Sequence, residues 1–200
     1  MKYIKTFEAK KIAEHPFINS AKRGSSSTVS KHIKNGVDIN MSSKKDGKTA
    51  LMIASINSFL MVVDILIKAG ADVNFNDNEG RTALMMATTP QIIDKLLDAG
   101  ADVNIQDNDG ETAIMEFLHY GYTIDKFIQI LEKLMDKNLD LDIKNNSGKN
   151  FYEIIKYSLG TVFPSYTTIF LSGLEKYMNE NFPQYKEEWD FKHDVEKYNL

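Results

Sequence analysis

A repeated sequence is the feature that most constrains how this chain can fold. Residues 69–87 read Ala-Gly-Ala-Asp-Val-Asn and then Glu-Gly-Arg-Thr-Ala-Leu-Met, and nearly the same order returns over residues 99–115. Gly47, Gly80 and Gly110 each precede a threonine by two residues, and they lie 33 and 30 residues apart. Such a period indicates stacked copies of one small unit, because each copy buries its apolar face only against its neighbours.

A second series of turn residues has the same period. Gly36, Gly70, Gly100 and Asn138 each precede a short stretch of the type Ala-Asp-Val-Asn, where a helix ends and glycine or asparagine takes the left-handed conformation. Both series resemble the ankyrin repeat, and the resemblance covers roughly residues 14–181. It implies an all-α ankyrin-repeat solenoid of stacked helix-turn-helix units joined by β-turn or hairpin fingers.

We expect about five repeats, of which the terminal ones are degenerate caps. The predicted organisation is a leader at 1–12, a repeat domain at 13–182 (repeats near 13–43, 44–76, 77–106, 107–144 and 145–182), and a capping helix at 183–200.

Several residues predict where the first two repeats begin and end their helices. Pro16 suits the first turn of a helix, and the run from Ser25 to Thr28 reads as a turn with a hydroxyl cap rather than a phosphorylation site. In the second repeat, Thr49 is the predicted cap, and Leu60, with its apolar neighbours, is placed on the packing face of the second helix.

Two repeats depart from the usual length. The third is three residues short, and we place the loss between its helices, where Thr89 is a candidate cap and Pro90 a first-turn residue. The fourth is five residues long, and we place the addition in a helix over 123–137 that ends at Asn138. In the fifth, Asn150 is the predicted cap.

The end of the chain is expected to hold a closing helix over 167–178 and a last helix. Phe182, Tyr185 and Trp189 fall near one face of that last helix, which indicates either a docking site or a seal over the last repeat.

The inner helices also depart from the ankyrin pattern. Alanine stands where the family has proline, and Met52, Met85 and Met115 stand where it has histidine. The resemblance implies that this histidine makes hydrogen bonds between neighbouring repeats. We expect the methionines to pack in its place.

Composition excludes several classes of protein. There is no cysteine for disulfides or thiolate sites, and no apolar run reaches the roughly 18 residues of a membrane span. Residues 1–50 carry 11 Lys and Arg against 4 Asp and Glu, which we interpret as a solvated basic end rather than a nucleic-acid site. We expect a cytoplasmic monomer, with a secreted effector lacking a signal as the alternative.

No pattern of residues indicates catalysis. The histidines are scattered, and residues 107–111 resemble part of a calcium loop but lack its closing glutamate. Turn chemistry explains those acidic residues equally well. We therefore predict no enzyme, no metal and no cofactor.

The resemblance implies that finger tips and the exposed face of each first helix hold a protein partner. Tyr120 and Tyr122, flanked by Asp109 and Glu111, are the favoured centre, unless these tyrosines pack on the longer helix beside them. The function that follows is an adaptor or inhibitor, and the alternative is a regulatory or structural subunit that docks through its C-terminal helix. The candidate residues are Lys22 and Arg23 in the first repeat, Lys45, Asp46, Lys48, Ile56 and Asn57 in the second, Asn78, Glu79 and Arg81 in the third, Asn108, Asp109, Glu111, His119, Tyr120 and Tyr122 in the fourth, and Ser147, Lys149 and Tyr157 in the fifth.

Overall fold

The computed structural model describes residues 15–155, 173–174, 176–181 and 183. The chain divides into two compact parts, residues 1–101 and residues 102–200. The predicted leader, the start of the closing helix (167–172) and the aromatic residues Phe182, Tyr185 and Trp189 lie outside the described residues.

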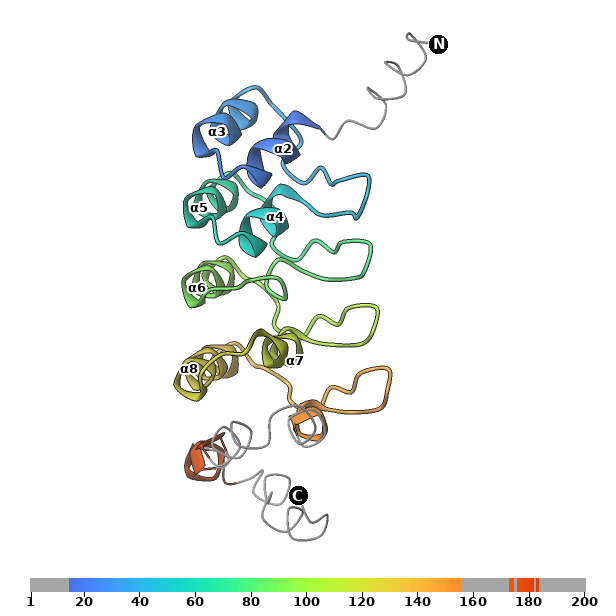
Figure 1. Cartoon of the computed structure of the whole chain (residues 1–200), viewed down its shortest axis with the longest axis vertical. Helices are drawn as coiled ribbons and strands as arrows, with labels where there is room; N and C mark the ends of the chain where they lie inside the picture. Colours follow the sequence, from blue (N-terminus) through green and yellow to red (C-terminus); the bar gives the residue numbers. More distant parts are fainter. Residues whose placement is uncertain (1–14, 156–172, 175, 182, 184–200) are drawn as a thin grey trace. The chain divides into compact units, whose positions relative to one another are not determined.

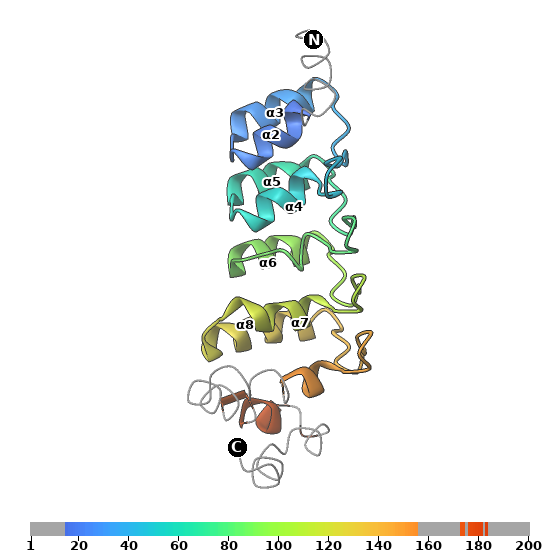
Figure 2. The same cartoon turned by 45° about the vertical axis from the view of Figure 1, so that its right-hand side comes forward.

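The N-terminal part is built from helices in two rows. One row holds α2 (Pro16–Lys22) and α4 (Ala50–Ile56), and the other holds α3 (Ser26–Lys34), α5 (Leu60–Lys68) and α6 (Pro90–Asp98), as Figures 1 and 2 show. Helix α2 packs on α3 and α4, and α5 packs on α3, α4 and α6. The predicted stack of helical hairpins is confirmed, with long turns, the fingers, projecting along one side (Figure 1).

Helix starts follow the predicted residues, with two differences in the first repeat. Pro16 opens α2, but the cap is the Nδ1 atom of His15, which accepts a hydrogen bond from the backbone nitrogen of Phe17 at 3.2 Å. Ser25 precedes α3 without capping it, because its hydroxyl lies 2.8 Å from that of Thr28 instead.

The second repeat has the predicted cap. The Thr49 hydroxyl accepts a hydrogen bond from the backbone nitrogen of Met52, and the Met52 sulfur accepts one from the nitrogen of Thr49. The packing face of α5 consists of Val62, Val63 and Leu66, all buried. The placement of Leu60 on that face is wrong, because its side chain is 41% exposed.

The third repeat loses its first helix, whereas the sequence had placed the missing residues between two helices. Only a turn forms over residues 83–86, closed by a hydrogen bond from the nitrogen of Ala87 to the oxygen of Leu84. Pro90 disfavours helical backbone at the residue before it, so the chain is already extended at Thr89. Thr89 precedes α6 as predicted, but its side chain makes no cap hydrogen bond.

The C-terminal part contains α7 (Ala113–Phe117), the 3-10 helix η1 (Leu118–Tyr120) and α8 (Ile124–Met135), followed by helical residues at 151–155 and 176–181. The predicted extra helix is confirmed, because α8 has 12 residues where α5 and α6 have 9. Asn138 takes the left-handed conformation at φ 59°, as predicted.

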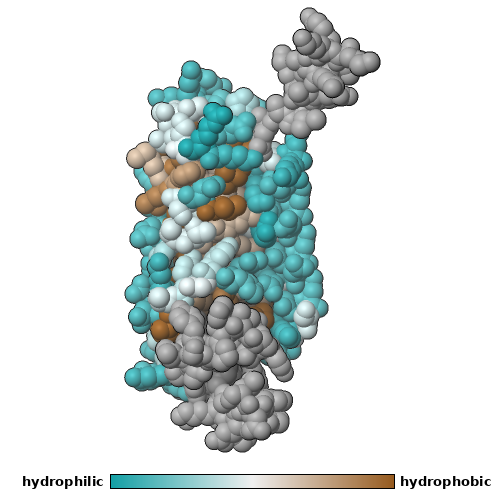
Figure 3. Space-filling view, in the orientation of Figure 1, coloured by the Kyte–Doolittle hydropathy of each residue, from teal (hydrophilic) through white to brown (hydrophobic). Residues whose placement is uncertain are grey.

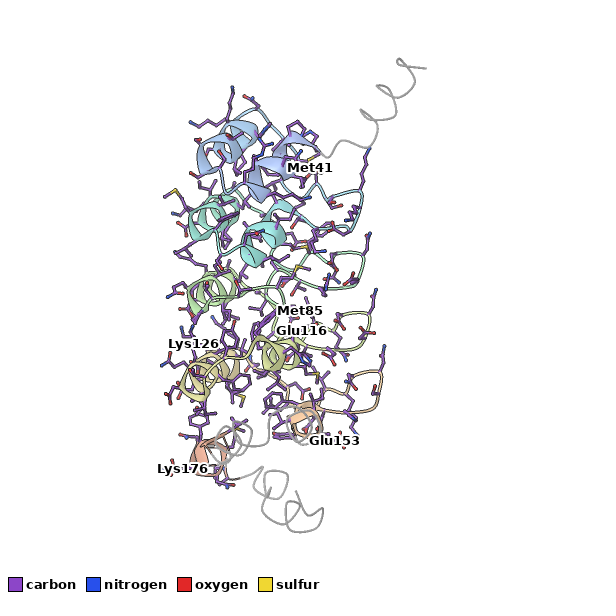
Figure 4. The ribbon with its side chains drawn as sticks, in the orientation of Figure 1. Met41, Met85, Glu116, Lys126, Glu153 and Lys176 are labelled. Carbon is purple, nitrogen blue, oxygen red and sulfur yellow. The ribbon has the colours of Figure 1, made fainter. Side chains whose placement is uncertain are left out.

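Asn150 caps the helical residues that follow it. Its Oδ1 accepts a hydrogen bond from the nitrogen of Glu153 at 3.1 Å, and a Glu153 carboxylate oxygen accepts one from the nitrogen of Asn150 at 2.9 Å. Figure 4 labels Glu153 at this helix start. The predicted cap is therefore one half of a reciprocal capping box.

Asparagines of the repeated stretches join successive repeats within each part. The Asn40 side chain accepts a hydrogen bond from the nitrogen of Asp72 at 2.8 Å, and the Asn104 side chain accepts one from the nitrogen of Asp140 at 2.9 Å. These bonds fix the spacing at which the fingers emerge.

Candidate partner-binding surfaces

The fingers share one turn, built around an acidic or amide side chain. Asp77, Asp107 and Asn145 each accept two backbone hydrogen bonds on Oδ1, from the residues two and four positions later. A glycine with φ between 73° and 79° follows each of them by three residues. This geometry points the intervening side chains outward. Of the acidic side chains at 107–111, that of Asp107 thus acts in the turn itself.

A charge network lies between the fingers of the second and third repeats, in the N-terminal part. The carboxylate of Asp77 is fully buried, and it lies 3.1 Å from Arg81 Nη2 and 3.6 Å from Lys48 Nζ. Lys48 also pairs with Asp46 at 3.0 Å, and Arg81 pairs with Glu79 at 2.6 Å. A buried carboxylate is costly without cationic partners, so the role of Lys48 and Arg81 in the structure is to stabilise the fingers.

The other candidate residues of these two fingers differ in solvent exposure. Burial raises the pKa of the Asp46 carboxyl, but hydrogen bonds from Lys48 and Ser43 outweigh it and hold the pKa below its usual value. Lys45, Asn78 and Glu79 are exposed. These three candidates face solvent on the fingers of this part.

Two candidates lie at the opposite end of α4 from its finger. Ile56 is 38% exposed, and Asn57 donates a side-chain hydrogen bond to the oxygen of Ile53 at 2.8 Å, which ends the helix. They occupy a different surface from the finger tips of the same part. Lys22 and Arg23 hold the equivalent place at the end of α2 and are exposed.

In the C-terminal part, the fourth and fifth fingers are hydrogen-bonded to each other. The nitrogen of Asn146 donates to the oxygen of Asp109 at 2.9 Å, and the Asn146 side chain donates to the oxygen of Asn108 at 2.8 Å. The Asn145 amide donates to Glu111 at 3.3 Å. Asp109 and Ser147 are exposed, whereas Lys149 is half-buried.

The aromatic candidates form a cluster behind this finger. The Tyr120 ring lies 6.1 Å from Tyr122 and 6.0 Å from Phe117, measured between centroids. Tyr122 is buried, and burial together with the nearby Tyr120 raises its pKa to about 12. Lys126, labelled in Figure 4, lies 5.8 Å from the centroid of the Tyr122 ring. Tyr122 thus packs against its neighbours, and Tyr120, 40% exposed, is the ring that faces outward.

His119 joins this cluster to the finger. Its Nε2 lies 3.9 Å from a carboxylate oxygen of Glu111, and Tyr120 follows His119 directly in the sequence. The structure therefore brings Glu111 beside His119, whereas a partner site that joins Asp109 with Tyr120 stays a prediction. Tyr157 lies outside the described residues.

Residues 17–107 match the family model for ankyrin repeats, in three copies. This stretch of the chain consists of ankyrin repeats. Ankyrin repeats are generally protein–protein interaction modules and are typically non-catalytic. None of the described helices is both long and apolar enough to cross a membrane.

Two features of these ankyrin repeats escaped the sequence analysis. Asp77, at the centre of the charge network, was not selected, although comparison with Asp107 and Asn145 marks the same turn position in each finger. Met61 was not selected either, and its exposure could have been found by aligning the second helices, because Gln91 and Asp125 stand at its position.

Proposed function

We propose that this ankyrin-repeat protein is a non-catalytic adaptor or inhibitor that binds one protein partner through its finger tips and first helices. The observation that carries the proposal is the placement of Tyr120. Its ring is 40% exposed, and it is held between Phe117 and the buried Tyr122. An aromatic ring that is fixed before binding loses little entropy when it enters a partner's pocket.

The charges around Tyr120 supply the rest of the surface. Asp109 is exposed on the finger of the same repeat, and Glu111 of that finger lies beside His119. A partner with a basic rim around an apolar pocket is complementary to this arrangement, because carboxylates at the edge of an interface favour cationic groups opposite them.

The test compares charge reversal at the finger with the same change elsewhere. A partner is first isolated from the native lysate with the intact protein and is then titrated against purified variants. Asp109→Lys and Tyr120→Ala should each weaken the complex by at least about tenfold, because hot-spot residues contribute about 2 kcal/mol or more. Asp98→Lys, which reverses an exposed charge at the last residue of α6 and outside the fingers, is the control. Equal affinity in all three variants would refute the proposal, provided that their circular dichroism melts match the parent.

Docking through the aromatic C-terminal helix, cytoplasmic location and a monomeric state stay predictions of the sequence.

A further inference from the structure

An apolar patch lies at the end of α4 remote from the fingers. Ile56, Leu60 and Met61 are 38%, 41% and 68% exposed, and together they form what we term the α4–α5 patch. Only one other large apolar side chain among the described residues, Tyr120, is comparably exposed. In Figure 3, apolar residues gather on this face at the level of α4 and α5. The seven residues of α4 separate the patch from its finger by roughly 10 Å.

The fold does not require an apolar residue at the most exposed position. Met61 is the second residue of α5, and the second residues of α3, α6 and α8 are Ser27, Gln91 and Asp125, all exposed. The stack therefore forms equally well with polar side chains there. An isolated exposed apolar residue is ordinary, but three within six positions mark a contact surface.

The turn that carries the patch is held from both sides. The Phe59 ring lies against Gly24 of the preceding turn, so closely that a Cβ on Gly24 would be 2.9 Å from it. The Ser58 hydroxyl lies 2.7 Å from that of Thr88, which in turn donates to the oxygen of Ile56 at 3.4 Å. A partner would thus meet a surface that is already ordered.

The charge beside the patch is positive. Arg23 is exposed next to Gly24, and within the described part of the chain no carboxylate is paired with it. The carboxylate nearest along α5, Asp64, is already bound to Lys68 at 2.8 Å and to Lys95 at 2.9 Å. Arg23 can therefore pair with a carboxylate supplied from outside, and its planar fork suits a bidentate contact.

We propose that the α4–α5 patch binds an amphipathic segment of a protein partner whose apolar side chains are flanked by Asp or Glu. The apolar side chains would pack on Ile56, Leu60 and Met61, and a carboxylate would pair with Arg23. Methionine suits this role because its flexible thioether adapts to different apolar shapes. A second copy of the chain is a poorer occupant, since two-fold pairing of this patch would bring the Arg23 residues of both copies to one small interface. This surface is additional to the finger surface proposed above.

The test selects displayed random peptides on the intact protein and counterselects them on the Met61→Ser variant. Peptides that depend on the patch should combine large apolar residues with an excess of Asp and Glu. Their affinity should fall at least about tenfold with Met61→Ser and also with Arg23→Glu. Asp109→Lys, in the finger, should leave it unchanged, which separates this surface from the finger proposal.

Three results would overturn the inference. The first is that none of the selected peptides distinguishes the parent from Met61→Ser, and the second is that the patch-dependent peptides lack an acidic excess. A concentration-dependent dimer in sedimentation, abolished by Met61→Ser, would instead assign the patch to contact between copies. Because Met61 is mostly exposed, Met61→Ser should keep the melting temperature of the parent, and circular dichroism checks this.

Discussion

The sulfur of Met52 lies 3.4 Å from the backbone nitrogen of Thr49, while the Thr49 hydroxyl lies 3.3 Å from the nitrogen of Met52. A thioether thus completes a capping box in which glutamate or glutamine is the usual partner. Met85 and Thr82 repeat the arrangement, each contact being 3.4 Å. Methionine therefore does more than fill space at the position where the family has histidine.

Thr49→Val should destabilise the protein, whereas Thr112→Val should not. Both threonines are buried at the same position of their repeats, but the Thr112 hydroxyl has no hydrogen-bond partner among the described residues. Loss of a cap costs about 1 kcal/mol, whereas removing an unpaired buried hydroxyl is neutral or favourable. The free energy of unfolding of each variant is measured by urea unfolding followed by circular dichroism. Equal losses in the two variants would show that the Thr49 cap contributes nothing.

Asp77→Ala should destabilise the protein by about 3 kcal/mol or more, because it leaves two backbone N–H groups and two cations without their buried partner. Asp77→Asn should cost less, since the amide oxygen still accepts both backbone bonds, as Asn145 does in the fifth finger. The matched control is Asp107→Asn. Asp107 accepts the same two backbone hydrogen bonds, but no cation is paired with it among the described residues. If Asp77→Asn and Asp107→Asn are equally mild by urea unfolding, the charge network is not stabilising.

The sequence could predict the stack because its repeated residues fix local structure. Pro16, Thr49, Gly70 and Asn138 all act through backbone geometry within a few residues, and local geometry can be deduced from residue type. The lost first helix of the third repeat was not predicted, because it depends on whether a helix can still form when only six residues separate Thr82 from Thr89.

The candidate site was harder to predict than the fold. Alignment assigned Asp109 and Glu111 to the fourth finger and Tyr120 to the turn after the first helix of that repeat, since this only required knowing the position of each residue in the repeat. It could not show that Tyr122 is buried while Tyr120 is exposed, two residues apart, because η1 and the left-handed Gly121 set the direction of each ring. Charge networks such as that of Asp77 depend in the same way on contacts between fingers.

The stabilising effect of Asp64 should disappear in acid. Hydrogen bonds from Lys68 and then Lys95 lower its pKa to about 2, from an ordinary value near 3.8. A carboxyl with a depressed pKa in the folded state stabilises the fold above its unfolded pKa and loses that effect as the pH falls through its folded pKa. The difference in melting temperature between the parent and Asp64→Asn should therefore be constant above about pH 5 and should shrink between about pH 4 and pH 2.

Lys68→Met and Lys95→Met separate the two contacts of Asp64. Lys95 lies on α6 and links it to α5, whereas Lys68 lies on the same helix as Asp64. In each lysine variant, the pH-dependent difference in melting temperature should be smaller than in the parent. If the melting temperatures of the parent and Asp64→Asn match at every pH, Asp64 does not stabilise the fold.

Gly110→Ala should destabilise the C-terminal part more than Gly148→Ala. Both glycines have left-handed backbone, φ 78° and φ 73°, so each alanine carries a similar strain of about 1 to 2 kcal/mol. At Gly110 the new Cβ would also lie 2.8 Å from the nitrogen of Asn146, in the neighbouring finger, whereas at Gly148 no atom of the described residues lies within 4 Å. Gly110→Ala must therefore also push apart the two fingers that carry Asp109 and Asn146. Hydrogen exchange at the Asn146 amide, which donates to Asp109, should accelerate in Gly110→Ala and not in Gly148→Ala. Equal exchange at this amide would mean that the close contact between the fingers is absent in solution.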